Sequence, residues 1–250
     1  MHELTEVLAP NRVAHLVEDG IYSVLPDASR AHHYDRRATV YDLVVSTRWY
    51  NSIMWGSSPR EYVAFARQAL TSSQDGTLLD AGCGSMLFTS EIYLETGRQI
   101  IAFDQSLAML RRARRRLVRV AGRVPEHIVL LQADLGDLPF RASSFRTILC
   151  LNVLHQFAEA TALLHNMERL LVDGAELFLT SLILNNRFVG DRYLHALYRI
   201  REFVHPRTSS DLYNMVKEAM QHDVSYSAQG NMAFCKCVCT NTQERRKVNR

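Results

Sequence analysis

The chain has 250 residues, of which 47% are hydrophobic and 22% are charged, and its net charge is only +3. Such a chain can bury one substantial core, and these values are ordinary for a soluble globular protein. No apolar stretch approaches the roughly 20 residues that a membrane-spanning helix needs, which excludes a membrane-spanning protein.

The N-terminal residues and the cysteines indicate in which cellular compartment the protein is expected to occur. Residues 1–12 carry acids and no continuous apolar run, so we expect no secretory signal. The five cysteines form no disulfide framework, which favours a reducing cytosol and predicts a cytoplasmic protein. Cys235, Cys237 and Cys239 alternate along an expected strand, so we interpret them as small buried hydrophobic residues and expect no metal site.

The segment 1–75 contains helical stretches rich in aromatic residues, and we expect it to form a helical cap. Tyr34 and Tyr41 lie seven residues apart and can share one helical face. Two interpretations stay open for this pair. The tyrosines either close over a ligand and contact the substrate, or they pack in the core of the cap.

From residue 76 onward, short apolar runs alternate with helical patterns. This alternation predicts an α/β fold with a parallel sheet, helices on both faces and right-handed crossovers. The C-terminal part instead predicts an antiparallel hairpin. The expected strands are 77–81, 99–104, 128–133, 145–151, 175–182, 224–227 and 232–239, and the expected helices are 85–96, 106–122, 159–171, about 191–203 and one from Ser209 or Ser210.

The first expected strand ends in Asp80, and Gly82 and Gly84 follow it. Glycines allow a ligand to approach the backbone closely, while a carboxylate repels a pyrophosphate and attracts an ammonium group. A nicotinamide-binding fingerprint would also need glycine at the position of Leu87. The loop therefore favours S-adenosylmethionine over a dinucleotide.

Two further acids end the next two expected strands. Asp104 follows Asp80 by 24 residues, where an acid accepts hydrogen bonds from ribose hydroxyls. Asp134 could accept a hydrogen bond from an adenine amino group, and the Leu135 amide could donate to the ring. Taken alone, each acid could equally be a helix cap or a surface residue. Their order along the chain favours one shared ligand.

The series LLDAGCG, IAFDQS, QADLGDLPF and FRTILCLNVLHQF resembles the successive motifs of class I S-adenosylmethionine-dependent methyltransferases. The stretch 34–42 also resembles the small-molecule, type 11 or quinone-methyltransferase-like branch. The resemblance implies a doubly wound, mostly parallel seven-stranded sheet, Rossmann-like, with an antiparallel final strand. We expect residues 76–250 to form the core, with a lid insertion at about 183–222, because that segment falls outside the strand–helix alternation and could cover the ligand-binding edge of the sheet.

The resemblance implies transfer of a methyl group from S-adenosylmethionine to a small molecule. His155, just beyond the fourth strand, is a candidate general base, with packing behind the loop as the alternative. The family usually has a third glycine where this chain has Met86. The residues implied are His155 and Tyr34 for catalysis, and Tyr41, Asp80, Ala81, Gly82, Gly84, Asp104, Gln105, Asp134, Leu135 and Asn152 for the cofactor.

Three alternatives remain. The arginine run 111–116 would suit an RNA methyltransferase, although apolar residues at helical spacing within it favour a solvated helix face and no nucleic-acid partner. The substitution at Met86 would suit a protein that binds S-adenosylmethionine without turnover. A homodimer is also open, because the sequence does not address oligomeric state.

Overall fold

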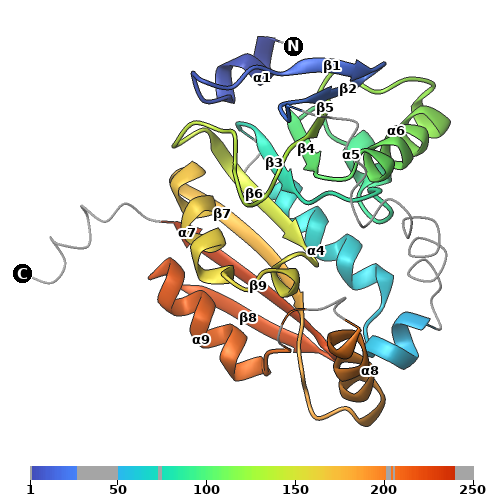
Figure 1. Ribbon diagram of the computed structural model, residues 1–250, viewed down its shortest axis with the longest axis vertical. Helices are drawn as coiled ribbons and strands as arrows, with labels where there is room; N and C mark the ends of the chain where they lie inside the picture. Colours follow the sequence, from blue (N-terminus) through green and yellow to red (C-terminus); the bar gives the residue numbers. More distant parts are fainter. Residues whose placement is uncertain (1, 27–49, 73–74, 201–203, 205, 240–250) are drawn as a thin grey trace, which may run out of the picture.

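A computed structural model describes residues 2–26, 50–72, 75–200, 204 and 206–239. These residues form one nine-stranded sheet with helices on both faces (Figure 1). No helix among them is long and apolar enough to cross a bilayer. The strands are β1 (His15–Glu18), β2 (Ile21–Ser23), β3 (Leu78–Ala81), β4 (Ile100–Asp104), β5 (Ile128–Gln132), β6 (Phe145–Leu151), β7 (Leu171–Leu182), β8 (Val224–Gln229) and β9 (Met232–Cys239).

The strand order is β1-β2-β5-β4-β3-β6-β7-β9-β8. The run from β2 to β7 is parallel, whereas β1, β9 and β8 each pair antiparallel to their neighbour. This arrangement confirms the predicted α/β fold class and its antiparallel C-terminal strands. The helices are α1 (His2–Val7), the π-helical turn η1 (Asn51–Trp55), α4 (Pro59–Thr71), α5 (Ser90–Leu94), α6 (Leu107–Ala121), the 3₁₀ turn η2 (Leu154–Gln156), α7 (Ala160–Leu170), α8 (Phe188–Arg199) and α9 (Ser209–Met220).

The sheet has two strands more than the predicted seven, because the hairpin β1–β2 extends it past β5. The segment 1–75 is therefore not wholly helical in its described part. The hairpin is too short to give a clear sequence pattern. It turns at Gly20, whose φ is +76°, and two arginines of α6 fix it, since Arg111 pairs with Glu18 and Arg114 with Asp19.

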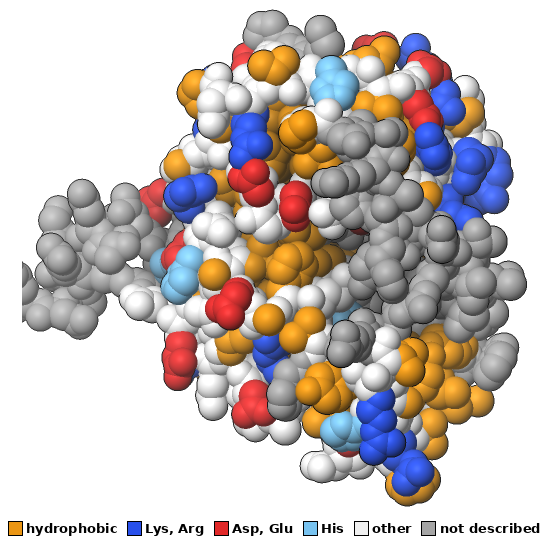
Figure 2. Space-filling view, viewed as in Figure 1, with side chains coloured by type: hydrophobic (Ala, Val, Ile, Leu, Met, Phe, Trp, Pro, Cys, Tyr) orange, Lys and Arg blue, Asp and Glu red, His pale blue; other side chains and the backbone are white. Residues whose placement is uncertain are grey.

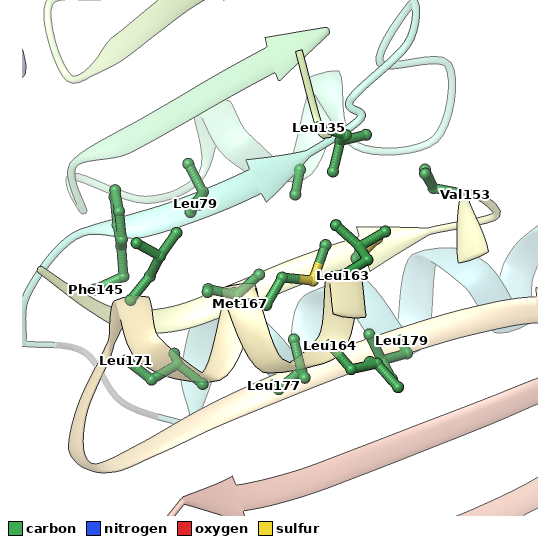
Figure 3. Close-up of a cluster of buried hydrophobic side chains, with 14 of the residues drawn as sticks. Leu79, Leu135, Phe145, Val153, Leu163, Leu164, Met167, Leu171, Leu177 and Leu179 are labelled. Carbon is green, nitrogen blue, oxygen red and sulfur yellow. The ribbon is translucent and has the colours of Figure 1, made fainter. Parts of the chain in front are cut away.

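Two apolar layers sandwich the sheet. On one face α7 inserts Leu163, Leu164 and Met167 between Leu79 and Leu177 of the sheet (Figure 3). On the other face α4, α5 and α6 cover the sheet. A helix that buries one stripe leaves its other positions to water. The arginines of α6 therefore occupy the positions between its buried residues, as the helical spacing predicts.

Strand β9 pairs with β7 and β8, and the three cysteines on one of its faces are buried. Burial raises the pKa of the Cys235 thiol to about 12. These residues thus pack as small hydrophobic side chains, as the alternation predicts.

One predicted helix is wrong at its start. The pattern predicts a helix over 85–96, but α5 begins only at Ser90. The intervening loop contains Met86 with φ of +53°, a left-handed conformation that a helix cannot accommodate. The loop therefore stays open along the edge of the sheet, where it forms one wall of a cavity.

Candidate functional site

A cavity of about 200 Å³ lies beyond the carboxyl ends of β3, β4 and β6. The strand order reverses between β3 and β6, and open α/β sheets bind ligands at such a switch point. Four segments of the described chain supply most of its walls. They are the loop 82–89, residues 104–106, residues 151–153 and the pair Gln156 and Phe157, with Tyr62, Asp80, Met109 and Leu135 completing the lining.

The loop after β3 depends on two glycines for different reasons. Gly82 has φ of +75°, and a Cβ there would lie 2.6 Å from Cγ2 of Val153. Gly84 has φ of +54°, but a Cβ there would meet nothing within 4 Å. Gly82 is therefore required both by its conformation and by the close approach of the β6 end, whereas Gly84 is required by its conformation alone.

Met86 takes the position of the missing third glycine and also has a positive φ. A left-handed conformation costs a residue other than glycine about 1–2 kcal/mol. The side chain offsets this cost because it is almost completely buried in the cluster that α5 and α6 form on the sheet. The cavity remains open beside it, so this substitution does not close the site.

Helix α6 also fixes this loop from outside. Nη1 of Arg116 donates a hydrogen bond of 2.7 Å to the carbonyl oxygen of Ser85, the residue before Met86. Within the run 111–116, Arg116 therefore bonds to the loop, while Arg111 and Arg114 form ion pairs with the β1–β2 hairpin.

Asp104 at the end of β4 joins two neighbouring segments. Its Oδ2 accepts a hydrogen bond of 2.9 Å from the Gly84 amide, and its Oδ1 accepts one of 2.8 Å from the Ser106 amide. Ser106 in turn caps α6, because its side chain accepts from the Met109 amide. A carboxylate presents about four lone-pair positions, so an Asp104 oriented in this way can also accept from a ligand hydroxyl.

Asp80 at the end of β3 lines the cavity but is only 2% exposed. Tyr93 of α5 donates a hydrogen bond of 2.8 Å to its Oδ2. Burial raises the pKa of Asp80 to about 7, with a smaller contribution from the Asp104 charge and an opposing one from the Tyr93 hydrogen bond. A cation placed beside this carboxyl would stabilise its ionised form.

The described residues that line the cavity include two carboxylic acids and no lysine, arginine or histidine. The remaining lining is largely apolar, and the ring of Tyr62 stacks on that of Phe88 with centroids 5.5 Å apart. This wall suits an apolar or positively charged ligand. A phosphate would meet two acids and no cationic side chain among the described lining residues, which is unfavourable.

Three of the other predicted cofactor residues line the cavity, namely Gln105, Leu135 and Asn152. Asn152 has φ of +58°, and its amide donates to the Thr180 hydroxyl over 2.9 Å. This bond to β7 holds the end of β6 in the turn that brings Val153 against Gly82.

Two of the described residues predicted to bind the cofactor do not line the cavity. Ala81 is buried within β3. Asp134 is half-buried, and its Oδ1 accepts a hydrogen bond of 2.8 Å from the Gly136 amide. Its carboxylate thus stabilises its own turn, and the neighbouring Leu135 is the residue that reaches the site.

His155 is 7% exposed and is not among the residues that line the cavity. Burial and the nearby Arg207 charge lower the pKa of His155 to about 3. A neutral histidine with so low a pKa is a poor general base near neutral pH. The structure therefore agrees with packing behind the loop. Tyr34 and Tyr41 lie outside the described residues, so their roles stay predictions.

Sequence reasoning missed Tyr62, Tyr93 and Phe157. Tyr62 reaches the cavity only through the packing of α4 on the sheet, and Tyr93 only through α5 folding back over Asp80. Phe157 is the last residue of the fourth motif, FRTILCLNVLHQF, and that position was the available sequence signal for it.

The comparisons with known proteins agree with this geometry. Residues 79–179 match the family described as "Methyltransferase domain". An uncharacterized chloroplastic methyltransferase of Arabidopsis thaliana is 26% identical over 158 residues. That match covers 61% of this chain but 44% of the relative, so the chain spans less than half of the relative's length.

Two solved structures share the fold at low identity. Phosphoethanolamine N-methyltransferase 2 of Haemonchus contortus, in complex with phosphomonomethylethanolamine and S-adenosylhomocysteine, gives a TM-score of 0.65 at 13% identity over 85% of this chain and 59% of that one. The [4+2]-cyclase SpnF gives 0.61 at 15% identity over 84% and 97%. The family match spans β3 to β7, which is less than half of the chain, and the two solved structures show that the chain shares their fold.

Proposed function

We propose that the chain binds S-adenosylmethionine in this cavity and transfers its methyl group to a small molecule. The observation that carries the proposal is the glycine loop flanked by Asp80 and Asp104, in a cavity whose described lining contains no cationic side chain. This arrangement suits a ligand with a positive charge and hydroxyl groups, and it disfavours a phosphorylated one.

The residues present fit that cofactor. Asp104 is oriented by two amides to accept from hydroxyl groups, and Asp80 is held by Tyr93 where it can face a cation. Leu135 supplies apolar surface for a flat ring. When bound, S-adenosylmethionine supplies a methyl group already activated on a sulfonium. The chain itself has to orient the acceptor and exclude water, and orientation alone can supply roughly 7–11 kcal/mol.

The apolar wall of the cavity would exclude water from the acceptor side. Phe88, stacked on Tyr62, forms part of this wall together with Phe157. None of the described histidines or lysines lines the cavity, and Asp80, the described lining carboxyl with a pKa of about 7, is assigned to the cofactor in this proposal. We therefore propose an acceptor that needs no deprotonation by the described residues. The predicted role of Tyr34 remains the alternative source of a proton acceptor.

The small-molecule acceptor is favoured over RNA by the positions of the arginines. Three members of the run 111–116 already bind the hairpin or the loop, so less of the run remains to bind phosphates. We also propose a reducing compartment such as the cytosol, because all five cysteines are free thiols.

The proposal is tested with S-adenosylmethionine that carries a radioactive methyl group. The full chain is incubated with this donor and an extract of its source cells, and the products are separated into small-molecule, protein and nucleic-acid fractions. We expect label in the small-molecule fraction. Label confined to nucleic acid would refute the proposed acceptor class, and donor binding without any label transfer would refute catalysis.

A further inference from the structure

The outer face of α8 carries apolar and basic side chains together. Phe188 is 77% exposed, Ile200 just after the helix is 64% exposed, and Val189 is also exposed. Between them the exposed Arg192 and Arg199 follow at helical spacing. We call these five residues the α8 face. Figure 2 shows hydrophobic and basic side chains gathered at the lower right, where Figure 1 draws this helix.

The charge of this face has one sign. The single acid of α8, Asp191, is half-buried and directed at the body of the protein, where its Oδ1 accepts hydrogen bonds from the Asn231 side chain and the Asn185 amide. Arg192 lies over the Phe188 ring at 5.3 Å from the centroid. No acid of α8 therefore neutralises its exposed arginines.

The helix is held firmly in this orientation. Gly190 packs so closely on the β8–β9 turn that a Cβ there would lie 1.8 Å from Oδ1 of Asn231. The inner residue Leu194 is completely buried in a cluster with Tyr62, one of the residues that line the cavity. The α8 face is thus a fixed surface on the outside of the cluster that borders the site.

Three kinds of occupant can be compared on chemistry. A second copy of the chain, meeting this face across a two-fold axis, would bring like charges together. A nucleic acid would neutralise the arginines but leave Phe188 and Ile200 in water. An anionic bilayer surface accommodates both, since its head groups pair with arginines and its interface accepts aromatic and aliphatic side chains.

We propose that the α8 face docks the protein on the surface of a lipid bilayer that contains anionic lipids. This docking is peripheral, and it does not depend on the proposed methyl transfer. It places the outer side of the Leu194 cluster against the bilayer.

The experiment is sedimentation of the full chain with vesicles. Phosphatidylcholine vesicles are compared with vesicles that also contain phosphatidylserine, at low and high salt. Phe188→Asp and the double variant Arg192→Glu/Arg199→Glu are compared with Val13→Asp. Val13 is a matched control, because it is 78% exposed and precedes β1, which Figure 1 draws at the opposite end of the molecule from α8.

We expect binding to the anionic vesicles only, weakened by salt and reduced about tenfold or more by each α8 variant, since each removes an apolar or a basic contact with the interface. Val13→Asp should bind like the wild type, and all variants should keep the wild-type unfolding midpoint, because the changed side chains are exposed.

Three results would overturn the proposal. They are equal sedimentation with both vesicle types, loss of binding in the arginine variant but not in Phe188→Asp, and a dimer in lipid-free gel filtration that Phe188→Asp dissolves. The second result would indicate a purely electrostatic partner such as a nucleic acid, and the third would indicate a second copy.

Discussion

The two sides of the cavity are built in different ways. On the β3–β4 side, the Asp104 carboxylate and backbone amides from short stretches of chain hold one another through hydrogen bonds, and Tyr93 holds Asp80. On the β6 side, side chains from α4, η2 and the end of β6 come together mainly through packing, and the Asn152 amide bonds to Thr180 of β7. The first side can be recognised locally in a sequence, whereas the second exists only once the chain has folded. We therefore expect the first side to determine cofactor binding and the second to determine the acceptor.

The largest effect should come from Asp104→Ala. This change removes a charged acceptor from two amides and from a ligand hydroxyl, so we expect affinity for S-adenosylhomocysteine to fall ~100-fold in calorimetric titration. Asp134→Ala is the control, since this carboxylate lies outside the cavity and should matter less than about threefold. Similar losses in both variants would contradict the difference that the structure shows between them.

The two sides touch at Gly82, so its replacement tests how they fit together. Gly82→Ala should lower the free energy of unfolding by ~2–3 kcal/mol, because the new Cβ would clash with Val153 and the positive φ would be strained. Gly84→Ala should cost only ~1 kcal/mol, because there is space for its Cβ. Urea unfolding measures both values, and equal values would show that Val153 does not press on the loop.

The raised pKa of Asp80 predicts a pH dependence of cofactor binding. Between pH 8 and 6, affinity for S-adenosylhomocysteine should fall by about tenfold, because a cationic group binds the ionised carboxyl and the pKa of the free site is about 7. Asp80→Asn should bind weakly at both pH values. A wild-type affinity that is flat over this range would remove Asp80 from the cation site.

Asp80 also makes folding stability depend on pH, with the opposite sign: stability falls as pH rises, whereas cofactor affinity rises. The pKa of Asp80 is higher in the folded state than its ordinary value of 3.8, so the native state holds a proton that the unfolded state releases. Asp80 therefore destabilises the empty protein as pH rises from about 4 to about 7. Asp80→Asn should remove this part of the pH dependence of unfolding.

A smaller effect is expected from Arg116→Gln. Loss of the hydrogen bond to Ser85 loosens the loop that carries Met86, so affinity for S-adenosylhomocysteine should fall by about fivefold, as expected for one hydrogen bond. Arg115→Gln is the matched control, because Arg115 is an exposed neighbour on the same helix. If both variants bind like the wild type, the bond to Ser85 does not position the loop.

The sequence alone predicted the sheet, because strands ending in an acid or in a glycine turn are local patterns. It missed the β1–β2 hairpin because the seven residues of its two strands give too little periodicity, and because Arg111 and Arg114 hold it from far along the chain. It also extended α5 backwards, since a left-handed Met86 cannot be inferred from the residue type.

The candidate site was likewise predicted in part: positions fixed by local patterns were found, and positions fixed by distant contacts were missed. The sequence placed Asp80 and Asp104 correctly at the cavity, because the end of a parallel strand is a fixed position in the fold. It also assigned roles to His155 and Asp134, yet both side chains lie away from the cavity. Their orientation depends on the turns that follow β5 and β6, and a motif does not specify which way a turn directs its side chains.

The most direct test of the central claim is a parallel calorimetric titration of the wild-type chain with S-adenosylhomocysteine and with the dinucleotide NAD. We predict micromolar binding of the first ligand and no detectable binding of the second at millimolar concentration, since the cavity wall presents acids where a pyrophosphate would lie. Comparable binding of NAD, or no binding of S-adenosylhomocysteine, would contradict the account.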